Sequence, residues 1–287
     1  MKIVSFTVVH PKIPSPFKKL IKILNKNALV CDFLILNDNK LTTNQKKIIN
    51  KFKNVYVIEK SKTPNINRAI GLSECIKLNY DYIINFDLDD NPERHFFKKI
   101  VKKISKTNQK LFYTNLIFNK KLFIIKRKIE MKNIIKFNYL GYGCSVMHKS
   151  VAKNFIKFSK YNIISLDWFF ILHYLSKNKF VLCERNIKII YNKTKHNFLA
   201  TNKIFSEKRI RDIVLIKINL YKNLIKHLNL KKKIYNFIKK EIKLSNLILT
   251  NVDEVRNILK KKKEKLVYRW NELDITYRDF NNAIKKR

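Results

Sequence analysis

In roughly the first two thirds of the chain, short apolar runs rich in β-branched residues alternate with segments whose apolar positions recur at helical spacing. The runs predict strands and the intervening segments predict helices. The first predicted strands are Ile3 to Val9, Cys31 to Leu36, Val55 to Ile58 and Asp81 to Phe86. The helices between them are Phe17 to Leu24, Thr42 to Phe52 with Thr43 as N-cap, and Pro64 to Leu78. This alternation requires right-handed crossovers, so we expect an α/β fold with a mostly parallel sheet.

The pattern becomes less regular further along the chain. Two runs predict a hairpin around Asn119 and Lys120, and helices and strands follow up to Ile190. The elements expected there are Leu111 to Phe118, Leu122 to Lys126, Cys144 to His148, Val151 to Phe158, Asp167 to Leu175 and Phe180 to Ile190. From Ser206 on, apolar positions at helical spacing alternate with Lys, which predicts three or four helices up to Ile284. We therefore expect an α/β domain over residues 1–205 and a basic helical extension over residues 206–287.

Charge and composition narrow the class of protein. Lys and Arg number 63 against 21 Asp and Glu, so the net charge is +42, while 46% hydrophobic residues exclude a disordered polar chain. Such a charge raises the prospect of nucleic acid or an anionic membrane surface as a partner. The Lys residues are spread along the whole chain, however, which is also typical of codon bias, and no RNA-binding signature occurs.

The cysteines and apolar segments bear on metal sites and location. No CxxC pair occurs among the four cysteines, which argues against a zinc ribbon or a dithiol redox site and predicts buried thiols in a reducing compartment. No run approaches the length of about 18 apolar residues that spans a bilayer, and no secretory signal is visible at the N-terminus. We therefore expect a cytoplasmic protein, either free or peripheral on the inner membrane face.

The sharpest local feature is the acidic run Asp87-Leu88-Asp89-Asp90, which directly follows a predicted strand. The carboxyl ends of strands in an open parallel sheet are where ligands bind. Alternation along an extended chain would put Asp87 and Asp89 on one side, where two carboxylates can hold Mg²⁺ or Mn²⁺ together with phosphates. An EF-hand is excluded, because Pro92 stands where that loop needs Gly and Lys98 where it needs Glu. Helix capping by Asp90 or Asn91 is the competing structural role.

The surroundings of these acids carry a family resemblance. Asn67-Arg68-Ala69-Ile70-Gly71, a helix, and the strand ending in Asp87-Leu88-Asp89-Asp90 resemble the Arg-Asn-x-Gly and Asp-x-Asp-Asp motifs of family-two glycosyltransferases. Upstream, Asn37-Asp38-Asn39 resembles the Asp-Asp-Gly at the end of the family's second strand. Downstream, Leu166-Asp167-Trp168 resembles its Glu-Asp-Trp motif. The motifs keep the family's order over residues 1 to about 200, with Asn37, Asn39, Ala69 and Leu166 departing from it.

The resemblance implies a GT-A fold, a nucleotide-diphospho-sugar donor and a divalent metal, Mn²⁺ or Mg²⁺. Asp87 would lie near the ribose and diphosphate, and Asp89 would hold the metal together with Asp87. Asp38 would contact the nucleoside, and Arg68 would neutralise the donor. The general base that deprotonates the acceptor hydroxyl would be Asp167. The reaction would be inverting, with a glycan or lipid-linked acceptor.

Four residues have competing interpretations. Asp167 would also suit the N-cap of the helix that begins near it. His196 is placed where many relatives have a histidine that reaches the metal or diphosphate, but it would equally suit an exposed loop. Gly141 and Gly143, two of only three glycines, indicate a close backbone approach, either in a substrate loop or in a plain tight turn.

Other functional classes remain alternatives at this point. A basic nucleic-acid-binding protein, a non-catalytic scaffold on the same fold, and a nucleotidyltransferase acting on sugar phosphates are the competitors. A nucleotidyltransferase would be expected to have a Gly-rich N-terminal loop, and this sequence has none. No Walker A or GxSxG motif occurs.

Overall fold

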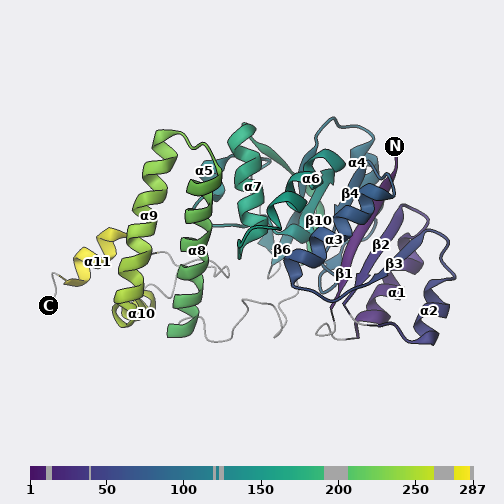
Figure 1. The fold of residues 1–287 in the computed structure, drawn as a ribbon, viewed down its shortest axis with the longest axis horizontal. Coiled ribbons are helices and arrows are strands. Elements are labelled where there is room, and N and C mark those ends of the chain that lie inside the picture. Colours follow the sequence, from purple (N-terminus) through teal and green to yellow (C-terminus); the bar gives the residue numbers. More distant parts are fainter. Residues whose placement is uncertain are drawn as a thin grey trace.

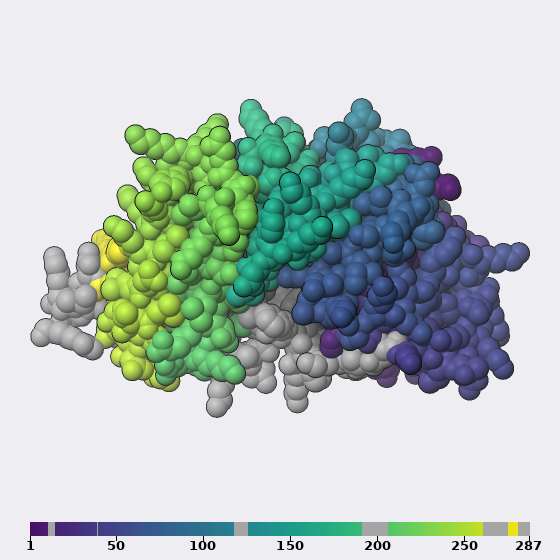
Figure 2. Space-filling model, in the orientation of Figure 1, coloured from purple at the N-terminus to yellow at the C-terminus, as the bar shows by residue number. Residues whose placement is uncertain are grey.

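The computed structural model describes residues 1–10, 15–38, 40–118, 121–122, 126–190, 206–261 and 275–284. The molecule is elongated, with the sheet toward one end and the C-terminal helices at the other (Figure 1). The surface shows the same division, since the purple and blue N-terminal units form one end and the green and yellow helices the opposite end (Figure 2). The α/β class and the helical extension expected from the hydrophobic pattern are confirmed.

One mixed sheet organises the α/β part. Its strand order is β3-β2-β1-β4-β9-β6-β10-β5, with β7 beside β6 and β8 beside β10. The strands are β1 (Ile3–Val9), β2 (Asp32–Asn37), β3 (Val55–Glu59), β4 (Tyr82–Asn85), β5 (Asn91–Pro92), β6 (Leu111–Phe118), β7 (Lys121–Leu122), β8 (Lys128–Ile129), β9 (Ser145–His148) and β10 (Val181–Ile190).

The longest pairings in this sheet are parallel. Strands β3, β2, β1 and β4 run parallel to one another, as do β6 and β10. Strand β9 is antiparallel to both of its neighbours, and β5, β7 and β8 form short antiparallel pairs. The pairing of β6 with β7 is the expected hairpin. Strands β2 and β4 are buried along almost their whole length, which is why they read as continuous apolar runs rather than as alternating ones.

Helices cover both faces of the sheet. They are α1 (Pro16–Asn27), α2 (Thr43–Ile49), α3 (Pro64–Lys77), α4 (Phe96–Ile104), α5 (Met131–Ile134), α6 (Lys149–Phe158), α7 (Leu166–Lys177), α8 (Glu207–His227), α9 (Lys232–Thr250), α10 (Val252–Lys261) and α11 (Tyr277–Ile284), with the 3₁₀ turn η1 (Tyr142–Cys144). Helix α3 approaches β1 so closely that a Cβ at Gly71 would overlap the ring of Phe6. The glycine that ends the Arg68 motif therefore lets this helix, and Arg68 with it, sit against the sheet.

Two expected helix starts are wrong. The N-cap of α2 is Thr42 and not Thr43, because Thr42 Oγ1 accepts from Gln45 N at 3.2 Å while the Gln45 side chain accepts from Thr42 N. Neither Asp90 nor Asn91 caps a helix. Residues 91–92 pair with β10 as the extended strand β5, and α4 begins only at Phe96, after His95.

The C-terminal helices contribute to two separate apolar clusters. Leu220, Tyr221 and Leu224 of α8 belong to the main core, and Tyr221 Oη donates to the carbonyl of Ile135 at 3.0 Å. The second cluster joins α8 to the later helices through residues such as Ile213, Ile248, Val255 and Phe280. The later apolar residues of α8 thus pack on the α/β part, and its earlier ones pack on the other C-terminal helices. The boundary at residues 205 and 206 stays a prediction, since residues 191–205 lie outside the described ranges.

The state of the cysteines and the hydropathy of the described helices match the expectations from the sequence. All four cysteines are free and buried. None of the helices in the described ranges combines the length and apolarity that crossing a bilayer requires.

Candidate functional site

Three polar side chains follow three neighbouring parallel strands. His10 follows β1, Asp38 follows β2, and Asp87 lies two residues beyond β4. Because β1 pairs in parallel with both β2 and β4, these residues reach the same edge of the sheet. In an open α/β sheet, ligands bind at the carboxyl ends of the strands, at the point where the strand order reverses. Here the order reverses between β1 and β4.

The acidic run forms a turn at this edge. Asp90 N donates to the carbonyl of Asp87 at 3.1 Å, so the chain is not extended here, and the alternation argument for Asp87 and Asp89 is wrong. Leu88 points into the core with 1% exposure. Burial and the charge of Asp87 together raise the pKa of Asp89 to about 6, so the two carboxylates lie within electrostatic reach of each other despite the turn.

Arg68 of α3 reaches back to the acids. Its Nη2 lies 3.4 Å from Asp87 Oδ1, and its guanidinium lies over the ring of Tyr142, 4.6 Å from the centroid. Burial opposes the charge of Arg68, but the nearby carboxylates of Asp87 and Asp167 outweigh it and raise the arginine pKa. The Asp87 side chain stays 41% exposed, so a ligand can reach it while Arg68 holds its other side.

The backbone at Gly143 comes close to Asp87, which agrees with the close approach expected from the glycines at 141 and 143. Gly143 lies in η1, and a Cβ built there would collide with the Asp87 carboxylate and would lie 2.9 Å from Asp87 N. A Cβ at Gly141 would meet nothing within 4 Å. Only Gly143 is therefore required to be glycine by its contacts, and it lets η1 pack directly against Asp87.

Asp167 lies in the first turn of α7 and does not cap it. The N-cap position is Ser165, and Asp167 Oδ1 accepts from Trp168 N at 2.8 Å. On its other oxygen, Asn138 Nδ2 donates to Oδ2 at 3.5 Å. Burial raises the pKa of Asp167, while the charge of Arg68 and the Trp168 hydrogen bond act against that rise. The carboxyl is thus half-buried and is oriented by groups on either side.

Asp38 is held by two side chains at the same edge. Asn67 Nδ2 donates to Asp38 Oδ1 at 3.2 Å, and His10 Nε2 lies 3.3 Å from Asp38 Oδ2. Asp38 is only 8% exposed, and Asn67 is 1% exposed with its amide oxygen unpaired among the described residues. This subsite therefore offers fixed polar atoms beside the partly exposed ring of His10.

The acids fit a hard divalent cation. Asp87 and Asp89 are carboxylate oxygen donors in one turn, and magnesium or manganese sites with one or two carboxylates are completed by substrate phosphates and water. Within the described ranges, no group of three or more His, Cys, Asp or Glu side chains is arranged to hold a metal ion. His196, the third expected ligand, lies outside the described residues.

The structure brings together four of the six residues singled out in the sequence. Arg68, Asp87 and Asp167 interact through their charges, and Asp89 joins them through Asp87. Asp38 lies along the same edge in the His10 and Asn67 group. Sequence reasoning missed His10 and Tyr142. His10 had a usable signal, because it follows a strand just as Asp38 does.

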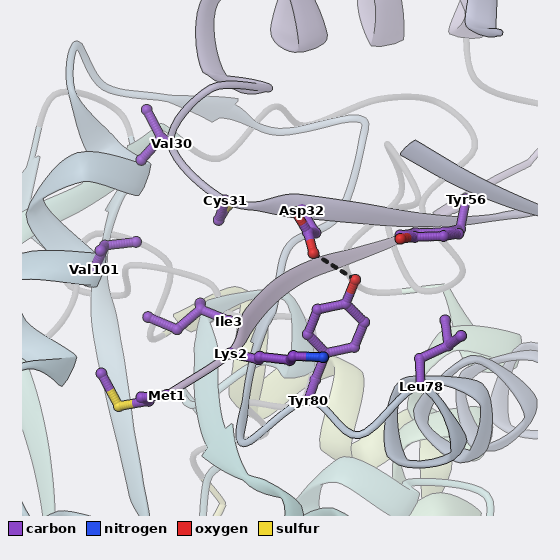
Figure 3. A pocket seen from close by; sticks show the side chains of 10 residues that line it. All are labelled: Met1, Lys2, Ile3, Val30, Cys31, Asp32, Tyr56, Leu78, Tyr80 and Val101. Atoms are coloured by element: carbon purple, nitrogen blue, oxygen red, sulfur yellow. Dashed lines mark hydrogen bonds between the residues drawn. The ribbon is translucent and has the colours of Figure 1, made fainter. Parts of the chain in front are cut away.

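A separate cavity lies at the opposite edge of the sheet. It has a volume of about 380 Å³ and is lined by residues at the amino ends of β1 and β2, with Tyr80 Oη donating to Asp32 Oδ2 at 2.6 Å (Figure 3). Its walls carry none of the residues singled out above. The amino edge is not where parallel sheets place their ligands, so the carboxyl edge remains the candidate site.

Comparisons with known proteins identify the family and the fold. A family model described as glycosyl transferase family 2 matches residues 14–162, more than half of the 287 residues. The sequence has no match among curated proteins. TarS 1–349 of S. aureus, solved in complex with UDP-GlcNAc, superposes with a TM-score of 0.58 at 13% identity, covering 91% of this chain and 78% of that one.

A second solved structure has the same architecture. Mannosyltransferase PcManGT from Pyrobaculum calidifontis, in complex with GDP-Man and Mn²⁺, has a TM-score of 0.53 at 9% identity and covers 93% of this chain and 76% of its own. At these identities the likeness concerns the fold, and it confirms the GT-A architecture that the motifs predicted. The chain belongs to glycosyl transferase family 2.

Proposed function

We propose that this chain is a metal-dependent, inverting glycosyltransferase that moves a sugar from a nucleotide-diphospho-sugar to a hydroxyl of a glycan or lipid-linked acceptor. The observation that carries the proposal is the cluster of Arg68, Asp87 and Asp167 at the carboxyl edge, with Asp89 beside it. These side chains come from α3, the turn after β4, and α7, so the fold itself assembles them. The nucleotide-sugar complexes of the two similar structures support a donor of this class.

The donor would lie along the carboxyl edge. Asp38, fixed by Asn67 and His10, would receive the nucleoside, and Asp87 the ribose and diphosphate side. Arg68 supplies a positive charge beside Asp87, where a departing diphosphate would gather negative charge. Asp87 and Asp89, with His196 as a further candidate, would hold Mn²⁺ or Mg²⁺, which supplies charge neutralisation to the diphosphate when bound.

Asp167 would take the proton of the acceptor. As the acceptor oxygen forms its bond to the anomeric carbon, the bond from that carbon to the diphosphate oxygen breaks, and the acceptor proton passes to the carboxylate. Burial raises the pKa of Asp167 and so brings its basicity closer to that of an effective general base. Asn138 and Trp168 N hold its two oxygens in place. Attack from the face opposite the diphosphate inverts the anomeric centre.

A panel of nucleotide-sugars tests this function directly. Binding and slow donor hydrolysis would be measured with UDP-, GDP-, CDP- and dTDP-sugars, with Mn²⁺ and with a chelator. We expect one nucleotide-sugar to bind in a metal-dependent way and to be hydrolysed slowly. Failure of every donor to bind, together with tight binding of RNA or DNA, would overturn the proposal in favour of the nucleic-acid alternative. Metal-dependent donor binding without hydrolysis or transfer would favour a non-catalytic scaffold.

Exchanging Gly143 for Ala should impair the reaction, whereas Gly141→Ala should not. The methyl group at residue 143 must displace the Asp87 carboxylate or the η1 backbone, while residue 141 has open space and an ordinary φ of −72°. A displacement of about 1 Å can cost about a hundredfold in rate, so we expect a loss of that order for Gly143→Ala. Steady-state kinetics and thermal melting of both variants measure the effect. Equal activities would show that the contact with Asp87 does not matter.

The basic tail should attach the enzyme to anionic membranes. Lys231, Lys232 and Lys233 are exposed at the start of α9, and a second Lys run spans residues 260–263. Each Lys near an anionic surface adds about 1 kcal/mol, so these clusters suffice for reversible attachment. We expect salt-sensitive sedimentation with anionic vesicles, weakened when both runs are changed to Gln. Equal binding to neutral and anionic vesicles, or to neither, would make the tail a structural appendage.

A further inference from the structure

A second large cavity opens beside the acids, on the face of the sheet that α1 and α4 cover. Its volume is about 990 Å³, and its walls are one face of α1 together with the segment from β5 to the first turn of α4. Ile23 and Phe97 form part of the wall, but both are buried in the core. Their apolar side chains therefore stabilise the fold and offer a ligand little surface. We call this space the α1 groove. The proposed donor site does not use it.

The charge of the α1 groove is almost entirely positive. Lys18, Lys22 and Lys26 follow one another at intervals of four residues along α1, and Arg94 faces them from the other wall. No described carboxylate pairs with any of these four side chains. The one acid in the wall, Glu93, is already neutralised by Lys99 at 2.8 Å and accepts from Lys188 N. The cations therefore remain available to a ligand.

The spacing of these cations requires a ligand with repeated charges. One turn of helix advances about 5.4 Å, so Lys18 and Lys26 are roughly 12 Å apart along α1. A single phosphate cannot reach all of them. A chain that carries one negative charge per repeat, extended along the helix, can meet each in turn.

Lys19 connects the α1 groove to the acids. It lines the groove, and its Nζ donates to the backbone carbonyl of Asp89 at 2.6 Å. Burial lowers the pKa of Lys19, while the charges of Asp89 and Asp90 act against that lowering. The groove thus ends at the turn that bears the proposed metal ligands.

The backbone of the groove is held in an uncommon conformation. Ser15 and His95, at φ 46° and 61°, are two of the three described non-glycine residues with positive φ, and both line the groove. Such residues cost free energy and persist where the surrounding structure holds them, often at ligand sites. They precede α1 and α4, whose first turns contribute Lys18, Lys19 and Phe97 to the lining.

We propose that the α1 groove binds an anionic glycan, a chain with repeated phosphate or carboxylate groups, which the enzyme uses as its acceptor. The inference rests on the proposed function, because a chain seated along α1 leads its end toward the acids. The groove is concave, whereas a bilayer meets a convex or flat surface. Of the two rings in the wall, Phe97 is 0% exposed and cannot stack on bases, which leaves only His95. Single-stranded nucleic acid is bound by stacking successive bases on several rings, so this wall suits it poorly.

The test compares oligosaccharides of equal length and different charge. Fluorescently labelled maltooctaose, phosphorylated maltooctaose and octagalacturonate would be titrated with the full chain at low and moderate salt. The variant K18Q/K22Q/K26Q removes the α1 cations, and K153Q/K157Q/K160Q removes three cations from exposed positions on or just after α6 as a matched control. Comparing the phosphate and carboxylate ligands identifies the anion.

We expect an anionic octamer to bind and the neutral one not to bind. The groove variant should weaken that binding by about a hundredfold, since three lysines are lost, each contributes on the order of 1 kcal/mol, and 1.4 kcal/mol is tenfold. In a plot of the logarithm of the binding constant against the logarithm of the salt concentration, the slope should become shallower by about two for three lost contacts. The α6 control should change affinity little. Donor affinity and donor hydrolysis should be unchanged in both variants, which separates this proposal from the function itself.

Three outcomes would overturn the proposal. The first is an equal loss of affinity in the groove and control variants, which would mean diffuse attraction by the net charge. The second is tighter binding of a single-stranded oligonucleotide than of either anionic octamer. The third is a groove variant that keeps wild-type affinity for the anionic octamers. If the wild-type chain binds the anionic octamer but no nucleotide-sugar, the groove assignment stands and the proposed function fails.

Discussion

Asp89→Asn should abolish metal-dependent donor binding while the fold survives. The neutral amide removes one of two closely placed carboxylates, and a single amide oxygen with one remaining carboxylate is a poor site for Mn²⁺ or Mg²⁺. Loss of even an outer partner of a metal ligand commonly costs about 10- to 100-fold in affinity, so we expect at least about a hundredfold here. Calorimetry with nucleotide-sugar and Mn²⁺, and with a chelator, measures the effect.

The stability of this variant should not fall. Burial and the charge of Asp87 raise the pKa of Asp89, so the native protein carries the cost of a charge that the amide does not have. Asp253→Asn is a suitable control, because that carboxylate is 90% exposed on α10 and far along the chain from the site. Unchanged Mn²⁺-dependent affinity in Asp89→Asn would remove Asp89 from the metal site.

Asp167→Asn should reduce turnover steeply and leave donor affinity nearly intact. The amide cannot accept the acceptor proton, and general-base catalysis contributes about 10²- to 10⁴-fold. Its oxygen can still accept from Trp168 N, so the start of α7 should persist. We therefore expect kcat to fall by about that factor at saturating donor, with the melting temperature nearly unchanged.

Asn138, which donates to Asp167, provides a control that distinguishes a catalytic role of Asp167 from a structural one. Asn138 acts through Asp167, so Asn138→Ala should lower kcat less than Asp167→Asn does and leave donor affinity intact. A fall in donor affinity without a fall in kcat would show that Asp167 is not the base. A large loss of melting temperature in Asp167→Asn would assign the carboxyl a structural role at the start of α7.

Local patterning predicted the order of strands and helices well, and the reason is physical. Strands β1, β2 and β4 are buried on both faces, so their sequences are mostly apolar and follow no helical period. The acids at strand ends and the Arg68 motif were also visible, because these groups follow directly from a strand or sit on one helix. The family and the GT-A architecture followed from their order.

Sequence patterning failed where a distant segment determined the local structure. The extended conformation of residues 91–92 depends on pairing with β10, nearly a hundred residues later, so a helix start at Asp90 looked equally good. The turn at residues 87–90 likewise contradicts the alternation expected for an extended chain. A contact outside the local window thus decided the helix start, whereas a local bond from Asp90 N to the Asp87 carbonyl closes the turn.

What the sequence determined by itself is therefore the family, the chemistry-bearing residues on strand ends and most of the elements, but not α4, α5, β5 or β8. Only the tertiary structure decided which of those residues meet. It placed Asp167 within the field of Arg68 and Asp87, packed Gly143 against Asp87, and joined His10 to Asp38. It also opened the α1 groove between α1 and the segment that leads into α4. The reason is that hydrophobic periodicity reports which face of an element is buried, whereas contacts between side chains depend on how the buried faces pack together.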